Sequence, residues 1–80
     1  DKAQEDIDFW KKSGNIAIQK RITKLLGSIS KTPFSGIGKP EPLKHELKGY
    51  WSRRITDEHR LVYTINEDRI KVISMRFHYT

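Results

Sequence analysis

The chain has no cysteine among its 80 residues, so neither a disulfide nor a thiolate metal site can support its fold. It also lacks any apolar run near the ~20 residues that a bilayer-spanning helix requires, and no secretory signal is visible. These absences predict a protein of the reducing cytoplasm with no membrane contact. The length predicts one domain, residues 1–80, with a modest hydrophobic core.

Positive charge, by contrast, is abundant. The chain has 16 lysines and arginines against 10 aspartates and glutamates, which gives a formal net charge of +6. A surplus of this kind favours an acidic partner, such as nucleic acid, a ribosome or an acidic protein. It fits a solvated surface without a specific partner equally well, so charge alone does not identify the partner.

The first part of the sequence predicts two helices joined by a tight turn. Residues 1–13 have apolar side chains at helical spacing, and Gly14 is a typical stop. Asn15 is suited to cap a second helix. One face of this second helix is apolar, with Ile18, Ile22, Leu25, Leu26 and Ile29. Helices so close in sequence predict an antiparallel hairpin that buries this stripe.

Residues 31–42 contain all three prolines and predict a loop. Pro40 and Pro42 flank Glu41 and bias it toward an extended conformation, so they place one carboxylate on a stiffened segment. The loop leads into residues 43–47, which include Lys44, and Gly49 then turns the chain into a strand. Glu41 is either a functional carboxylate or a surface residue of a connector, and the pattern alone leaves both interpretations open.

The remaining sequence predicts an antiparallel sheet of three strands. Residues 51–55 and 59–65 are rich in β-forming residues, and Thr56-Asp57-Glu58 supplies a three-residue turn between them. This pairing sets Arg54 opposite Arg60 on one face and directs Leu61, Tyr63 and Ile65 to the other, buried face. The predicted fold class is therefore α+β, with a two-helix hairpin packed on one face of a twisted antiparallel sheet and an open, cationic opposite face.

The third strand, residues 69–79, allows two registers. A three-residue turn at residues 66–68 buries Ile73, Met75 and Phe77 and puts Arg76 and His78 on the face of Arg54 and Arg60. A two-residue turn at Glu67-Asp68 inverts this parity and puts His78 on the core face. We favour the first register because it buries the larger apolar set.

The open face is expected to gather Arg54, Arg60, Arg76 and His78, and the stiffened loop can bring Glu41 and Lys44 over it. Together these side chains would provide what RNA cleavage by its own 2′-hydroxyl requires. That reaction needs a base, cations to hold the added negative charge, and an acid for the leaving oxygen. Plainer interpretations remain: His78 as a surface strand residue, and ion pairs of the arginines with Asp57 or Glu58. No metal or other cofactor is expected, because the three histidines show no ligand spacing. No serine stands in a nucleophile motif.

Four motifs match a known family: Lys39-Pro40-Glu41-Pro42-Leu43-Lys44-His45, Ser52-Arg53-Arg54-Ile55, Glu58-His59-Arg60-Leu61-Val62-Tyr63 and the closing Phe77-His78-Tyr79. Together they closely resemble the YoeB/Txe toxins of the RelE superfamily, over essentially the whole chain. The resemblance implies a microbial-RNase-like fold and a bacterial type II toxin that cuts mRNA in the ribosomal A site. It also implies roles for six residues: Glu41 as general base, Arg60 as transition-state stabiliser, His78 as general acid, and Lys44, Arg54 and Tyr79 in phosphate binding and substrate orientation.

The resemblance further implies the partners: mRNA on the 70S ribosome, a YefM/Axe-like antitoxin and a second copy of the chain, all in the bacterial cytoplasm. Family members usually have a short strand before the first helix, and we expect this strand to be missing here. Two other functions remain open. One is a ParE-like toxin of the same fold that binds gyrase without catalysis, which Glu41 and His78 argue against. The other is a module that binds RNA or antitoxin only.

Overall fold

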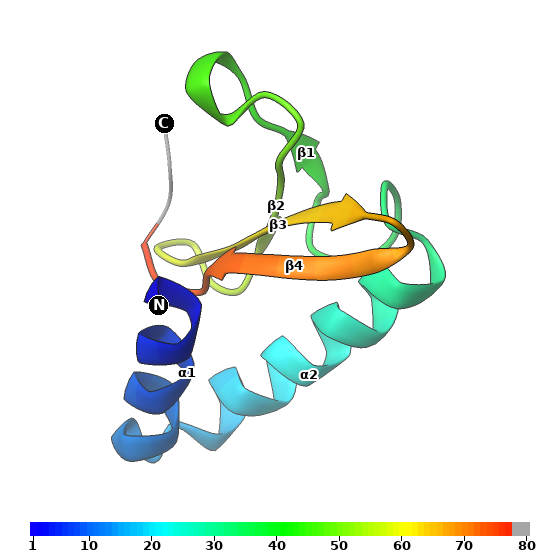
Figure 1. Cartoon of the computed structure of the whole chain (residues 1–80). Coiled ribbons are helices and arrows are strands. Elements are labelled where there is room, and N and C mark those ends of the chain that lie inside the picture. Colours follow the sequence, from blue (N-terminus) through cyan, green and yellow to red (C-terminus); the bar gives the residue numbers. More distant parts are fainter. Residues whose placement is uncertain (78–80) are drawn as a thin grey trace.

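The computed structural model describes residues 1–77, and the predictions for His78 and Tyr79 lie outside the described residues. Two helices, α1 (Lys2–Ser13) and α2 (Ile16–Lys31), precede a four-stranded antiparallel sheet. Its strands are β1 (Glu41–Pro42), β2 (Trp51–Arg54), β3 (Arg60–Asn66) and β4 (Arg69–Ser74), and a short 3₁₀ helix, η1 (His45–Leu47), lies between β1 and β2. Both helices lie on the same side of the sheet (Figure 1). The predicted α+β fold class is confirmed.

The helix ends follow the capping residues in the sequence. The side chain of Asp1 accepts a hydrogen bond from the backbone N–H of Gln4, and Gly14 ends α1 in the left-handed region at φ 72°. The side chain of Asn15 accepts from the N–H of Ile18 and begins α2, as predicted. The hairpin is an open one, because the two helices diverge from this turn (Figure 1).

The hydrophobic core lies between the helices and the sheet. The predicted stripe of α2 is confirmed: Ile22, Leu25 and Ile29 are buried, and Ile18 and Leu26 pack against them partly buried. The other buried members of the cluster come from α1, the sheet and its connections: Trp10, Ile55, Leu61, Tyr63 and Met75. This contact with the sheet holds α2 in place, since an isolated helix of this length is marginal in water.

The sheet has one strand more than the sequence predicted. Glu41 and Pro42, assigned to a loop, pair with Ser52 and Trp51 of β2 and form an edge strand. The loop prediction is wrong for these residues because the extended conformation that the prolines impose is also the conformation of a strand. Proline is tolerated there because an edge strand has one unpaired side.

The register that we favoured between the last two strands is wrong. The turn has two residues, Glu67 and Asp68, which stand at φ 51° and 63° and bring Asn66 opposite Arg69. Two consecutive left-handed residues make the turn whose twist matches that of the flanking strands. The sequence argument gave this turn only as the alternative, because the other register buried the larger apolar set.

A β-bulge then corrects the parity. Tyr63 pairs with Val72 but Val62 pairs with Ser74, so β4 contains one extra residue, Ile73, at this point. Val72, predicted on the open face, therefore packs against the core, whereas Met75 is buried as predicted. Phe77, predicted to be buried, is 53% exposed.

The strained turn yields a stability prediction. The double substitution Glu67→Asn with Asp68→Gly should raise the free energy of unfolding by about 1 kcal/mol, because it places residues that tolerate positive φ where the backbone requires it. Urea denaturation of both chains measures the change. If the urea concentration at the unfolding midpoint is unchanged or lower, with the same dependence of the free energy on urea, the left-handed turn is contradicted.

Candidate catalytic face

The strand pairing places three of the predicted residues, Glu41, Arg54 and Arg60, in two neighbouring rows on the sheet face away from the helices. One row runs across all four strands, with Glu41 opposite Ser52, Ser52 opposite Val62 and Val62 opposite Ser74. The next row contains the opposed pair Arg54 and Arg60, as predicted. Opposed residues share a face, and diagonal neighbours lie about 7–8 Å apart. Glu41 and Arg54 are such diagonal neighbours.

The middle of this face is closed, which differs from the open face that we predicted. Ser52, Val62 and Ser74 are all buried. Glu41, on the edge strand, is exposed, and Arg54 and Arg60 are partly exposed. The accessible charged groups therefore lie around the edge strand and the β2–β3 turn.

Arg60 is held in place by the turn that precedes it. Its Nη1 donates to the backbone oxygens of Thr56 at 2.7 Å, Asp57 at 3.0 Å and His59 at 3.2 Å. Carbonyl oxygens fix a guanidinium without cancelling its charge. Within residues 1–77, Nε and Nη2 of Arg60 make no hydrogen bond, so these donors remain for an anion.

Arg54 is fixed mainly through its backbone. Its N–H donates to the oxygen of Gly38 at 2.7 Å, and its own oxygen accepts from Nη2 of Arg21 at 3.2 Å. The guanidinium lies 3.9 Å from the carboxylate of Asp57, which is fully exposed. The ion pair with Asp57 that the sequence left open is thus present, but such exposed pairs contribute little and are easily exchanged.

Glu41 and Lys44 lie on the edge of the sheet near one another in sequence. Both are exposed, and neither forms an ion pair with any residue in the described part of the chain. Lys44 is the N-cap residue of η1 and directly precedes it. The N–H of Leu43 donates to the oxygen of Tyr50 at 2.9 Å, so backbone hydrogen bonding along this edge extends to Leu43, the residue before Lys44.

Arg76 does not join the cationic pair. Its guanidinium lies 3.7 Å from the centre of the Phe9 ring in α1 and 5.0 Å from that of Phe77. This is cation–π geometry. The prediction that Arg76 would stand beside Arg54 and Arg60 fails because the chain leaves β4 at Ser74 and turns toward α1.

Sequence reasoning missed Arg53, which is fully buried. Its guanidinium donates to four oxygens between α2 and β2: Ser28 Oγ at 2.7 Å, Thr32 O at 2.7 Å, Ser35 O at 2.8 Å and Ile37 O at 3.1 Å. Its Nε donates to the hydroxyl of Tyr63, which in turn donates to the oxygen of Pro33. Arg53 thereby fixes the connection that leads to Glu41. The available signal was strand alternation: with Arg54 on the outer face, Arg53 had to face the core.

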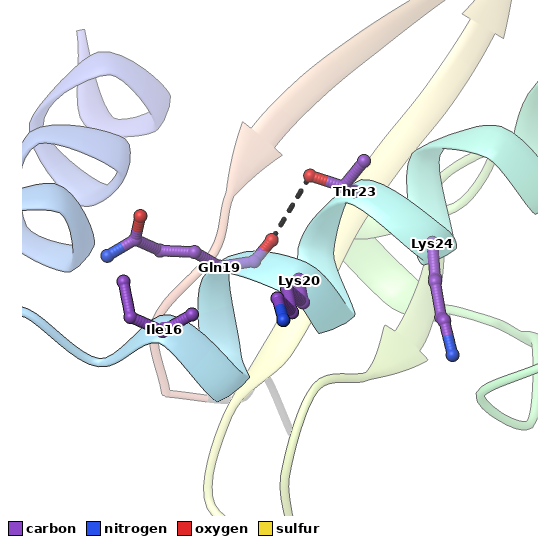
Figure 2. Close-up of a pocket in the computed structure, with 5 residues that line it drawn as sticks. All are labelled: Ile16, Gln19, Lys20, Thr23 and Lys24. Carbon is purple, nitrogen blue, oxygen red and sulfur yellow. Dashed lines mark hydrogen bonds between the residues drawn. The ribbon is translucent and has the colours of Figure 1, made fainter.

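Three hollows of the surface lie away from these charged residues. One of about 390 Å³ lies along α2 and is lined by Ile16, Gln19, Lys20, Thr23 and Lys24, with Thr23 bonded to the backbone of Gln19 (Figure 2). Two others lie beside Lys31 and beneath the β3–β4 turn. None of these three hollows is lined by Glu41, Arg54 or Arg60.

In residues 1–77, no group of three or more histidine, aspartate or glutamate side chains is arranged to hold a metal ion. Over the same residues, no helix has the length and apolar character needed to cross a membrane.

The fold is that of small bacterial toxins. A YoeB/ParE toxin from Agrobacterium tumefaciens superposes with a TM-score of 0.92 at 45% identity, covering 98% of this chain and 92% of that one. Two Staphylococcus aureus structures are also similar. One is a YoeB–YefM complex, with a TM-score of 0.88 at 47% identity, covering 96% of this chain and 88% of that one. The other is a YoeB dimer, with a TM-score of 0.87 at 46% identity, covering 98% of this chain and 90% of that one.

The chain belongs to the family of YoeB-like toxins of bacterial type II toxin–antitoxin systems, whose family model matches residues 1–79. Toxin RelK of Mycobacterium tuberculosis is 54% identical over 77 residues, which cover 96% of this chain and 89% of that protein. Toxin YoeB of a Synechocystis species is 56% identical over 71 residues, which cover 89% of this chain and 83% of that protein. The resemblance seen in the four sequence motifs is thereby confirmed.

Proposed function

We propose that this toxin is a ribosome-dependent endoribonuclease that cuts mRNA in the A site. The observation that supports this best is the register of the edge: Glu41 lies diagonally from Arg54, and Arg54 lies opposite Arg60. Two guanidiniums side by side repel one another, and a phosphate between them relieves this repulsion. A carboxylate next to such a pair is suited to take a proton from a hydroxyl beside the phosphate.

In the proposed reaction, Glu41 removes the proton of the 2′-hydroxyl, and the 2′-oxygen attacks the adjacent phosphorus. Arg60, with Arg54 and Lys44, holds the negative charge that gathers on the phosphoryl oxygens. The bond to the 5′-oxygen breaks, and His78 donates a proton to that oxygen. The products are a 2′,3′-cyclic phosphate and a 5′-hydroxyl end. Tyr79 orients the substrate base by stacking.

The proposed partners include a cognate antitoxin of the YefM kind and a second copy of this chain. The support comes from the Staphylococcus aureus relatives, one solved with YefM and one as a dimer. An acidic antitoxin segment would compete with RNA phosphate for Arg54 and Arg60. Action on the ribosome would place the toxin in the bacterial cytoplasm.

The test is cleavage of mRNA on programmed 70S ribosomes with mapping of the ends. The parent chain should cut within the A-site codon and leave 5′-hydroxyl ends. His78→Gln should lower kcat by roughly 100- to 10,000-fold, the usual contribution of a general acid. His45→Gln is the matched control, since His45 is exposed and its side chain bonds to no residue within 1–77; it should cut like the parent.

The outcomes separate the other two functions. Toxicity that survives His78→Gln, with no cleavage by the parent chain, would favour a gyrase-binding toxin. The similar structure from Agrobacterium tumefaciens has ParE in its name, and this is the reason to test gyrase binding as the alternative function. RNA affinity that falls steeply with salt, again without cleavage, would favour a binding module.

A further inference from the structure

The backbone just before the closing His78-Tyr79 pair is held at four polar atoms. At Met75, the N–H donates to Oδ2 of Asp6 at 2.8 Å, and the oxygen accepts from Nε1 of Trp10 at 2.8 Å. At Phe77, the N–H donates to Nδ1 of His59 at 2.8 Å, and the oxygen accepts from the N–H of Arg60 at 2.9 Å. One pair of contacts comes from α1 and the other from the start of β3. This segment therefore stays fixed beyond the end of β4.

One contact from α1, that of the Asp6 carboxylate, is not needed to cover the hydrophobic core and has an energetic cost. Asp6 is fully buried, and a buried carboxylate is unfavourable unless both oxygens are bonded. One oxygen binds Nζ of Lys2, and the other binds the N–H of Met75. The carboxylate is thus directed at the peptide chain that leads to His78.

The second pair of contacts holds Phe77 in an unfavourable conformation. Phe77 stands at φ 58°, in the left-handed region that side chains with a Cβ rarely adopt. Its ring is 53% exposed, so burial of the ring does not explain the conformation. The conformation is explained by the two hydrogen bonds of its backbone, from its N–H to His59 and from Arg60 to its oxygen. Strain that is maintained in this way is often found at functional sites.

We propose that His59 is a positioning residue for the cleavage reaction: its Nδ1 fixes the peptide of Phe77 and so directs His78, the next residue in the chain. This deepens the proposed nuclease function and rests on it. Because Nδ1 accepts this hydrogen bond, the ring is neutral with its proton on Nε2. The ring is oriented by edge-to-face contact with Trp10, with centres 5.0 Å apart. His59 acts through the peptide and does not touch the substrate.

A pair of substitutions separates the hydrogen bond from packing. His59→Phe keeps a ring against Trp10 and Phe77 but removes the acceptor. His59→Asn loses the ring but places an amide oxygen close to where Nδ1 stands. If His59 positions the peptide, His59→Asn cuts faster than His59→Phe, although His59→Phe is the more stable protein. A role in stability alone predicts the reverse order.

The experiment measures single-turnover cleavage on programmed ribosomes, with thermal unfolding of each variant. We expect His59→Phe to lower kcat by at least 10-fold with less than a 2-fold change in KM, because small misplacement of a catalytic group is costly in rate. His59→Asn should recover a large part of that loss. The double variant His59→Phe with His78→Gln should cut no more slowly than His78→Gln alone.

Three results would overturn the proposal. If the parent chain cuts and His59→Phe cuts with the parental kcat, the role of His59 fails while the nuclease function stands. If the losses from His59→Phe and His78→Gln multiply in the double variant, His59 acts on something other than His78. If the parent chain, folded and with the amide proton of Phe77 protected from exchange, does not cut at all, the nuclease function fails and the role of His59 fails with it.

Discussion

Replacing Arg60 by alanine is expected to lower ribosome-dependent cleavage by roughly 100- to 1000-fold, the usual effect of removing one preorganised donor to a charged transition state. Arg60 contributes a cation that the turn oxygens of Thr56, Asp57 and His59 hold in place. Because the charge it faces develops during the reaction, the loss should fall mainly on kcat. Single-turnover rates at saturating ribosome concentration measure it directly.

Two controls make this result interpretable. Arg69→Ala removes the same charge from an exposed position at the far end of β4 and should leave the rate within about 2-fold, since a distant surface charge is screened by salt. Arg60→Lys keeps the charge but loses the planar fork, so it should recover only part of the activity. A rate for Arg60→Ala equal to that of Arg69→Ala would remove Arg60 from the reaction.

Replacing Arg53 by alanine is expected to reduce the free energy of unfolding by about 4 kcal/mol or more. The substitution removes the guanidinium that donates to the backbone oxygens of Thr32, Ser35 and Ile37, and it opens a cavity where the side chain of Arg53 is fully buried. A domain of this size has a total stability of only about 5–15 kcal/mol. Its melting temperature should fall by more than about 15 °C.

The neighbouring arginine provides the matched control. Arg54 has a side chain that is 41% exposed, and within residues 1–77 its one ion pair, with Asp57, is 3.9 Å long. Arg54→Ala should therefore change stability by less than about 1 kcal/mol while weakening cleavage. Circular dichroism melts of the two variants test this contrast. Equal destabilisation by both substitutions would mean that the two arginines do not lie on opposite faces of β2.

Much of the fold could be predicted because it depends on local signals. Asp1, Gly14 and Asn15 set the helix ends through contacts within a few residues, and the apolar stripe of α2 depends only on helical period. The pairing of Arg54 with Arg60 followed from the length of one turn. The family followed from four motifs whose residue types and spacing stand in the sequence itself.

The candidate catalytic face was predicted only in part. Glu41 was expected to lie on a stiffened segment, and it does. The segment is an edge strand in which Glu41 pairs with Ser52, and this strand was not predicted because the prolines indicated a loop. Arg60 was expected either to bind phosphate or to pair with Asp57 or Glu58, and the three turn oxygens that bind one of its nitrogens were not foreseen. Arg53 was overlooked, because its importance depends on oxygens that are 16 to 25 residues away along the chain.

The sequence by itself determined the two helices, the apolar stripe, the pairing of β2 with β3 and membership of the toxin family. These features depend on residue type and on spacing over short stretches of chain. The tertiary structure alone decided the turn at Glu67-Asp68, the bulge at Ile73 and the fixation of Met75 and Phe77 by Asp6, Trp10 and His59. The physical reason is that local preference at these points is weak or unfavourable, so contacts between distant segments select the conformation.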